Sequence, residues 1–238
     1  MQAFLAILRF DLLQLAHSWL LRLWVALLVA PAIFLVIVAA NESELASETL
    51  SAYMAAVLVP LSLLAVAIMS SSAISGEAST IADAVLSRSV TRTEYLSAKI
   101  ASRVSISLAV YLLVTIPFCY LVIRYAVSDT SASGVTLAVL TLAVMLAFVT
   151  TFGIALSTLV RNIQLAVLIL LVTVLLSGAV LQFLGLTWMS TTYVVNQLPE
   201  TFRGETPFWH EFRVLFIFSL LTAGAVFSSI WTFRATDL

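Results

Sequence analysis

The sequence predicts an all-α polytopic membrane protein with six transmembrane helices. Hydrophobic residues make up 62% of the 238 residues and charged residues only 10%, whereas soluble domains are roughly 45–50% apolar. The mean hydropathy is +1.14. Six apolar runs reach the ~20 residues that a helix needs to cross a hydrocarbon core. A transmembrane β-barrel is excluded because its strands would alternate apolar and polar residues, and these runs are apolar on every side.

Short polar segments separate the six expected spans, so the chain reads as a single membrane domain over residues 1–238. The fourth span is long enough to tilt in the bilayer. Prolines at 31, 60 and 117 lie inside spans, where they can kink a helix. The expected spans are Trp19–Ala40, Leu50–Ser71, Val104–Val127, Val135–Val160, Leu165–Leu186 and Val214–Phe233.

Residues 1–18 predict an amphipathic helix that lies in the membrane interface and leads into the first span. A cleaved signal is not indicated, because no basic residue precedes the apolar part. A simple extension of the first span is the alternative. The apolar side consists of Phe4, Ile7, Leu8, Leu12 and Leu15, and the polar side of Arg9, Asp11, Gln14 and His17.

Basic residues are distributed unequally between the two sides of the membrane. With both termini in the cytoplasm, eight of the 11 basic residues fall inside and three outside, as the positive-inside rule predicts. We therefore expect a multi-pass protein of the cytoplasmic (inner) cell membrane with both termini inside. The inner set is Arg9, Arg22, Arg88, Arg92, Lys99, Arg103, Arg161 and Arg234, and the outer set is Arg124, Arg203 and Arg213.

A polar segment at residues 76–99, between the second and third spans, predicts a short helix on the cytoplasmic surface. It has an apolar stripe, N-cap candidates and an acidic residue in its first turn. The alternative is a solvated loop whose basic residues serve only to orient the protein. The stripe is Ile81, Val85 and Leu86, the N-cap candidates are Ser79 and Thr80, and the acidic residue is Asp83.

The same segment resembles a pattern shared by permease subunits of the ABC-2 type, in which it directly follows the second of six spans. The resemblance covers about 25 residues and departs at Ser89, where a proline is common, and at Ala98, where glycine often precedes the lysine. These departures concern the rigidity of the turn. The matching residues are Ser75-Gly76-Glu77, Ser79-Thr80, Val85-Leu86-Ser87, Val90-Thr91-Arg92, Leu96 and Lys99.

The resemblance implies the transmembrane subunit of an ATP-driven exporter, which forms the substrate path. It further implies pairing with a second copy or a related permease, and a separate ATPase subunit that carries ATP and Mg. The N-terminal interface helix (1–18) and a re-entrant outer segment within 187–213 would be family features. The coupling segment at 76–99 would contact the ATPase through Glu77, Thr80, Asp83, Leu86, Ser87, Arg88 and Arg92.

Catalytic and cofactor motifs are missing from the sequence. No glycine begins a GxxxxGK[ST] phosphate-binding loop, so we expect no ATP site, no cofactor and no enzymatic activity in this chain. The pair His210-Glu211 lacks the second histidine of an HExxH zinc site, and no metal site is expected. Cys119 is the only cysteine and permits no intrachain disulfide. No carboxylate lies near the middle of an expected span, and this disfavours an ion-driven carrier.

The outer segment 187–213 is rich in aromatic residues. This composition fits short helices that enter the outer interface, and equally an aromatic belt on a loop. Polar residues within the spans either line a substrate path or pair the helices, the latter being the commoner use. These residues are Thr115, Thr150, Thr151, Thr173, Ser177 and Gln182.

Two other functional classes remain open at the level of sequence. One is the permease of a haem-export system for cytochrome maturation, which has a similar size and number of spans. The other is a membrane-embedded enzyme or a non-transporting scaffold. Apolar spans without midplane charge favour a lipid, an amphipathic peptide or a hydrophobic drug as substrate over a small ion. Membrane lipid is an expected neighbour, and nucleic acid is not an expected partner.

Overall fold

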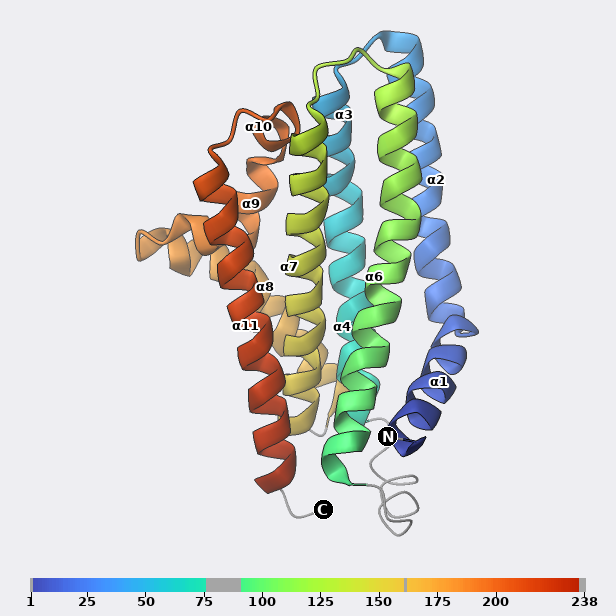
Figure 1. Cartoon of the computed structure of the whole chain (residues 1–238), viewed down its shortest axis with the longest axis vertical. Coiled ribbons are helices and arrows are strands. Elements are labelled where there is room, and N and C mark those ends of the chain that lie inside the picture. Colours follow the sequence, from blue (N-terminus) through green and yellow to red (C-terminus); the bar gives the residue numbers. More distant parts are fainter. Residues whose placement is uncertain (1, 76–90, 161, 236–238) are drawn as a thin grey trace.

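The computed structural model describes residues 2–75, 91–160 and 162–235. These residues are helical almost throughout, and the only bridge of the β type among them joins Leu45 to Val127. In chain order the elements (Figure 1) are α1 (Gln2–Ala16), α2 (Trp19–Glu42), α3 (Ala46–Tyr53), η1 (Met54–Leu58), α4 (Val59–Ser75), α6 (Arg92–Tyr125), α7 (Ala132–Leu159), α8 (Ile163–Phe183), η2 (Thr187–Met189), α9 (Thr191–Asn196), α10 (Leu198–Arg203) and α11 (Phe208–Ala235).

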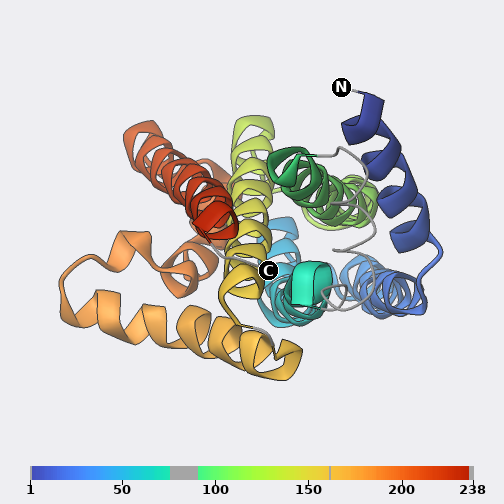
Figure 2. The same ribbon diagram turned by 90° about the horizontal axis from the view of Figure 1, so that it is seen from below.

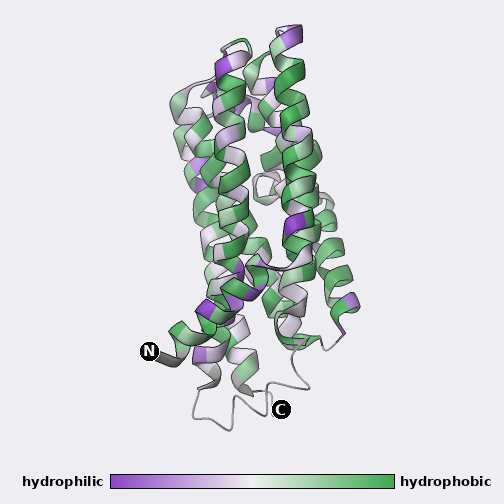
Figure 3. Ribbon diagram, turned by 90° about the vertical axis from the view of Figure 1, so that its right-hand side faces the viewer, coloured by the Kyte–Doolittle hydropathy of each residue, from purple (hydrophilic) through white to green (hydrophobic). Residues whose placement is uncertain are grey.

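Six helices of the described part of the chain are long and apolar enough to cross a membrane. They are α2, the continuous helix α3–η1–α4, α6, α7, α8 and α11. The hydropathy colouring in Figure 3 shows these helices apolar over most of their length. The prediction of an all-helical fold with six apolar helices of spanning length is therefore confirmed for the described residues.

Several span boundaries differ from the sequence prediction. The second span begins at Ala46 rather than Leu50, the third at Thr93 rather than Val104, and the sixth at Phe208 rather than Val214. The sequence prediction ended each span where charged residues begin. The helices nevertheless continue through charged residues whose side chains have partners inside the protein. Lys99, Arg103 and Glu211 are such residues, and all three are buried.

Helix α7 lies at the centre of the bundle. It contacts α4, α6, α8, α10 and α11, and in the end-on view of Figure 2 it lies between α8 and α11 on one side and α4 and α6 on the other. Small and polar residues let neighbouring helices approach it closely, as is common in membrane bundles. At Gly153, for example, an added Cβ would lie only 2.0 Å from the hydroxyl oxygen of Ser70 on α4.

The described ends of the chain, the start of α1 and the last turns of α11, lie at the same end of the bundle (Figure 1). We call this the terminal end, and we call the opposite end, where α2 turns into α3, the far end. Helix α1 packs chiefly against α6 and lies on the outside of the bundle (Figure 2). Along the chain, the elements η2, α9 and α10 follow α8 and precede α11.

The second span contains a single π-helical turn, η1. The N–H of Val59 there bonds to the carbonyl of Met54, five residues earlier. Pro60 follows immediately. A proline has no N–H to donate, and its ring collides with the carbonyl four residues before it in a regular α-helix. A wider π turn relieves this collision and keeps the helix continuous.

Candidate functional site

The predicted coupling segment, residues 76–99, extends into the first turns of α6, and residues 91–99 are its described part. Thr91 caps this helix: its hydroxyl accepts a hydrogen bond from the N–H of Glu94 at 3.2 Å. In return, the Glu94 carboxylate accepts from the N–H of Thr91 at 3.4 Å. This reciprocal capping box fixes the start of the helix at Arg92. The T-x-x-E spacing is readable in the sequence, although it was not used to place this boundary.

A buried ion cluster joins α1 to α6 within the first three turns of α6. Lys99 Nζ lies 2.7 Å from Asp11 Oδ1, and the Ser102 hydroxyl donates to Asp11 Oδ2. Arg103 Nε lies 3.9 Å from the same Oδ2. Asp11 is 1% exposed and Lys99 4% exposed. Loss of one partner from a buried charge pair strongly destabilises a folded protein. The cluster therefore holds α1 in one position on α6.

Asp11 corrects the sequence prediction for residues 1–18. The carboxylate was assigned to the polar side of the helix, but it lies on the side that packs against α6. Its position follows from spacing, since Asp11 stands three or four residues from Ile7, Leu8 and Leu15 and therefore shares their face. Arg9 and Gln14 are exposed as expected. Polarity alone misassigned a residue whose partners lie 88 and 91 residues further along the chain.

A small apolar cluster completes the terminal end. It brings together Ile74 of α4, Leu96 and Ile100 of α6, Ile154 of α7 and Phe233 of α11. The ring of Tyr95 stacks on that of Phe233, with 6.4 Å between their centres. The first turns of α6 therefore contact three other spans as well as α1.

The predicted coupling residues lie almost entirely outside the described residues. Glu77, Thr80, Asp83, Leu86, Ser87 and Arg88 belong to the segment 76–90, and the predicted cytoplasmic helix falls there too. Arg92 is the first residue of α6. The role of all seven residues stays a prediction.

The six polar residues predicted for a substrate path are not brought together. Thr115 lies on α6, Thr150 and Thr151 on α7, and the other three on α8. Thr150 and Thr151 are buried, and their hydroxyls donate to carbonyls three or four residues earlier in the same helix. The hydroxyl of Ser177 does likewise. These contacts are those of helix-packing residues, and the path assignment stays a prediction.

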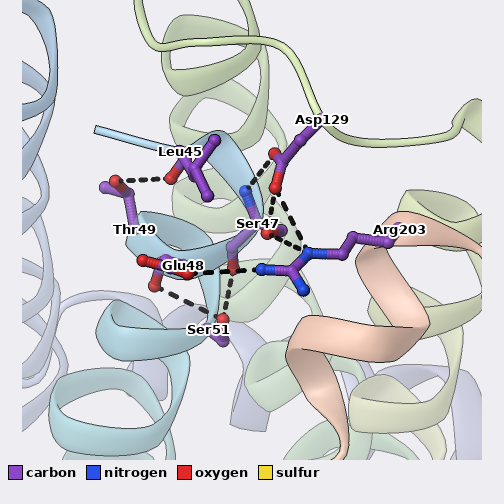
Figure 4. Close-up of polar contacts among 7 residues, drawn as sticks. All are labelled: Leu45, Ser47, Glu48, Thr49, Ser51, Asp129 and Arg203. Carbon is purple, nitrogen blue, oxygen red and sulfur yellow. Dashed lines mark hydrogen bonds and ion pairs between the residues drawn. The ribbon is translucent and has the colours of Figure 1, made fainter. Parts of the chain in front are cut away.

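At the far end, a polar network ties together α3, the loop between α6 and α7, and α10 (Figure 4). Asp129 accepts hydrogen bonds from the N–H of Ser47 at 2.8 Å and from its hydroxyl. Arg203 Nε lies 3.0 Å from Ser47 Oγ and 3.3 Å from Asp129 Oδ2. Its Nη2 lies 3.3 Å from Glu48 Oε1. Burial raises the pKa of Asp129, but the hydrogen bonds from Ser47 and Arg203 outweigh this and lower it.

A second carboxylate at the far end is Glu211, in the first turn of α11. It accepts from the hydroxyls of Thr201 at 3.0 Å and Thr141 at 3.3 Å. The sequence analysis did not single out either carboxylate network. No candidate role was assigned to Asp129, and Glu211 was considered for one only as part of the His210-Glu211 pair, because no local spacing indicates the partners of either carboxylate.

Among the described residues, no group of three or more His, Cys, Asp or Glu side chains is placed to hold a metal ion. Comparison with models of protein families finds no match, and comparison with curated proteins finds no relative.

Proposed function

We propose that this chain is the transmembrane subunit of an ATP-driven exporter of the ABC-2 type. The buried cluster of Asp11, Lys99 and Ser102 carries the proposal, because it fixes α1 to the first turns of α6. Helix α6 begins directly after the segment 76–90, in which the sequence resemblance puts the ATPase contacts. A displacement of that segment would therefore act on α1 and α6 as one unit.

In this proposal the terminal end faces the cytoplasm, in line with the positive-inside rule. A separate ATPase subunit binds ATP and Mg and docks on residues 76–92. A second copy of the chain, or a related permease, completes the transporter. Rigid-body motion of the ATPase pair is passed through α1 and α6 to the spans and switches access to the substrate path.

The outer segment has the role of a re-entrant element in this proposal. Its helix α9 contacts both α8 and η1. Because η1 lies within the second span, this contact supports a position of α9 below the outer surface rather than above it. The aromatic residues Trp188 and Trp209, near the two ends of this segment, suit a position near the lipid headgroups.

The proposal is tested by recovering the tagged full-length chain from the membranes of its source cells. We expect co-recovery of a P-loop ATPase, with Glu77→Ala and Arg92→Ala each reducing its yield. Truncating one partner of a charge-assisted hydrogen bond costs about 2–5 kcal/mol, which predicts a reduction of roughly tenfold or more.

Matched controls are Glu42→Ala and Arg124→Ala, which remove the same charges near the far end. Both should leave ATPase recovery unchanged. Wild-type recovery by both terminal-end variants, at equal levels in the membrane, would contradict the docking role. ATP hydrolysis by the purified chain alone would contradict the division of labour between the two subunits.

Orientation is tested separately with single cysteines in a Cys119→Ser background. A cysteine at Glu42 should react with an impermeant maleimide added to intact cells, and a cysteine at Ser89 only after lysis. The reverse pattern would rule out cytoplasmic docking. Ser47 is a poor labelling site because it is buried in the far-end network.

A further inference from the structure

An apolar cavity of about 360 Å³ lies between α4, α7, α8 and α9. Its walls are mainly aliphatic and include Leu58, Leu146, Val149 and Leu171. This volume falls within the ~300–1,000 Å³ typical of sites for small ligands. None of the six residues predicted for a substrate path lines it, although one of them, Gln182, lines the neighbouring space.

A second hollow, of about 390 Å³, lies between α8 and the segment η2–α9. Leu175 and Thr192 line both spaces, so the two lie side by side. The lining of the second hollow is mixed, and its polar residues include Gln182, Ser190 and Asn196. Together the two spaces have the polarity pattern of an amphiphile, with an aliphatic part next to a part rich in hydrogen-bonding groups.

Glycine at position 178 shapes the junction between the two spaces. A Cβ at this position would lie 2.9 Å from Thr192 Oγ1 and 3.3 Å from Ser190 Oγ. Helix α8 therefore approaches α9 closely at this level, and a larger residue would push against the lining of the second hollow.

Two buried hydroxyls on these walls have no hydrogen-bond partner among the described residues. Ser62 is 2% exposed and lines the apolar cavity, and Ser190 is 3% exposed and lines the second hollow. Ser70, two turns further along α4, behaves differently, because its hydroxyl donates to the carbonyl of Val66 at 2.6 Å. A buried polar group without a partner is destabilising. Both hydroxyl oxygens are covered by protein atoms, so a ligand in the two spaces would become their partner once each hydroxyl rotates toward it.

The chemistry of that ligand follows from the lining. No Asp, Glu, Lys, Arg or His is among the described residues that line either space. A charged group placed there would lose its hydration without gaining a counter-ion. The lining therefore favours a neutral ligand and disfavours one with a carboxylate, phosphate or ammonium group.

We propose that the two spaces form one binding site for an uncharged amphiphile of the membrane. Its acyl chain occupies the apolar cavity, and an ester or amide oxygen lies beside Ser62, whose hydroxyl rotates to donate to it. Its hydroxyl- or amide-bearing head occupies the second hollow, near Ser190 and Gln182. The site lies within one copy of the chain and needs no ATPase, so it does not rest on the proposed function.

The test uses the purified full-length chain, without any partner, in nanodiscs of phosphatidylglycerol. The probe is a monoacylglycerol with a diazirine in its acyl chain, and labelled peptides are mapped by mass spectrometry. Labelling should map to α4, α7 or α8 at the cavity wall. Unlabelled monoacylglycerol should compete about tenfold or more better than the fatty acid of the same chain, because only the latter is charged.

Two pairs of variants locate the site. Ser62→Ala should weaken probe binding about fivefold, as expected for one lost hydrogen bond of about 1 kcal/mol, whereas Ser70→Ala should not. Thr192→Phe fills the junction from an exposed position and should abolish labelling. Val172→Phe, on the exposed side of α8 and outside both spaces, should leave labelling intact. Because Thr192 is exposed, loss of labelling there is separable from loss of folding.

Three results would overturn the proposal. They are labelling that survives Thr192→Phe, equal competition by the fatty acid, and labelling that maps outside the two spaces. A fourth result would show that a second copy of the chain, rather than a lipid, occupies the two spaces. If a cysteine at Leu175, in a Cys119→Ser background, forms a disulfide between copies and this excludes the probe, the spaces are an interface between copies instead.

Discussion

Two polar clusters at opposite ends of the bundle, around Asp11 and around Asp129, differ in how far solvent reaches them. At the terminal end, a single buried carboxylate, Asp11, meets Lys99, Ser102 and Arg103 and joins two helices. At the far end, Asp129 and Arg203 belong to a partly exposed network that joins three segments. In the terminal-end cluster, the contribution to stability depends on one side chain, that of Asp11. In the far-end network, several side chains share it.

This difference has a physical basis in solvation. A buried charge that loses its partner has no water to replace it, whereas a partly exposed charge recovers much of its hydration. The same type of substitution should therefore have unequal effects at the two ends. The predictions that follow compare the two ends, beginning with the largest expected effect.

Asp11→Ala tests the terminal-end cluster and should have the largest effect. It removes the carboxylate that Lys99 and Ser102 contact, and breaking a buried pair in this way costs about 3–5 kcal/mol. The measurement is the free energy of unfolding of the purified chain in mixed micelles. Asp11→Asn, which retains an oxygen that can accept from Ser102, should lose less. A loss below about 1 kcal/mol for Asp11→Ala would remove the basis for treating α1 and α6 as one unit.

Asp129→Ala tests the far-end network and should have an intermediate effect. The side chain of Asp129 is 18% exposed and accepts from Ser47 and Arg203. Hydrogen bonds to a charged group contribute about 1.5–3 kcal/mol, and partial hydration of the site brings the expected loss to about 1–2 kcal/mol. The same unfolding assay applies. If Asp129→Ala is as damaging as Asp11→Ala, the contrast between the two ends is wrong.

Acid should weaken the far-end network through Asp129. The pKa of this carboxyl lies below its ordinary value of 3.8 in the folded chain. Its contribution is therefore fully present above that value and is lost as the pH falls through the lower folded pKa. The stability difference between wild type and Asp129→Asn should shrink from neutral pH to about pH 3 and below. A difference that is constant over this range would show that the charge of Asp129 contributes nothing.

Glu48→Ala should have the smallest effect. Glu48 is 63% exposed and pairs with Arg203 Nη2 at 3.3 Å. Exposed pairs contribute about 0–1 kcal/mol, and salt screens them. The loss should be near the lower limit at 0.15 M salt and slightly larger in dilute buffer. Because Asp129 and Glu48 share Arg203, a larger loss for Glu48→Ala than for Asp129→Ala would reverse the order proposed within the network.

The sequence was sufficient for the number and type of spans, because hydrophobic runs of this length have few alternatives. It was insufficient wherever a charge is neutralised by a distant partner. The third span was begun eleven residues too late because Lys99 and Arg103 look too polar for a span until Asp11 is brought beside them. The start of α11 was missed similarly, since Glu211 is buried against Thr141 and Thr201.

The candidate functional residues likewise divide into those indicated by local spacing and those that depend on contacts distant in sequence. Local spacing was enough to indicate the helix of residues 1–18, and the capping box at Thr91 and Glu94 was readable in the same way but was not used. The buried cluster required contacts across 88 residues of sequence, and the cavity with Ser62 required the packing of four helices. No periodicity in a single segment encodes either feature.

The π turn at Met54–Leu58 makes the second span unusually tolerant of a change in length. Each residue of an α-helix turns the chain by about 100°, so deleting Ser72 from α4 would turn every later side chain to a new face. A π turn instead contains one residue more than the surrounding helix needs. Deleting the exposed Ala56, together with Pro60→Ala, should close the helix into a regular one with Ser62 still facing the cavity. The amount of each deletion variant in the membrane and its labelling by the probe are the measurements. Both should stay near wild type for the Ala56 deletion and fall for the Ser72 deletion.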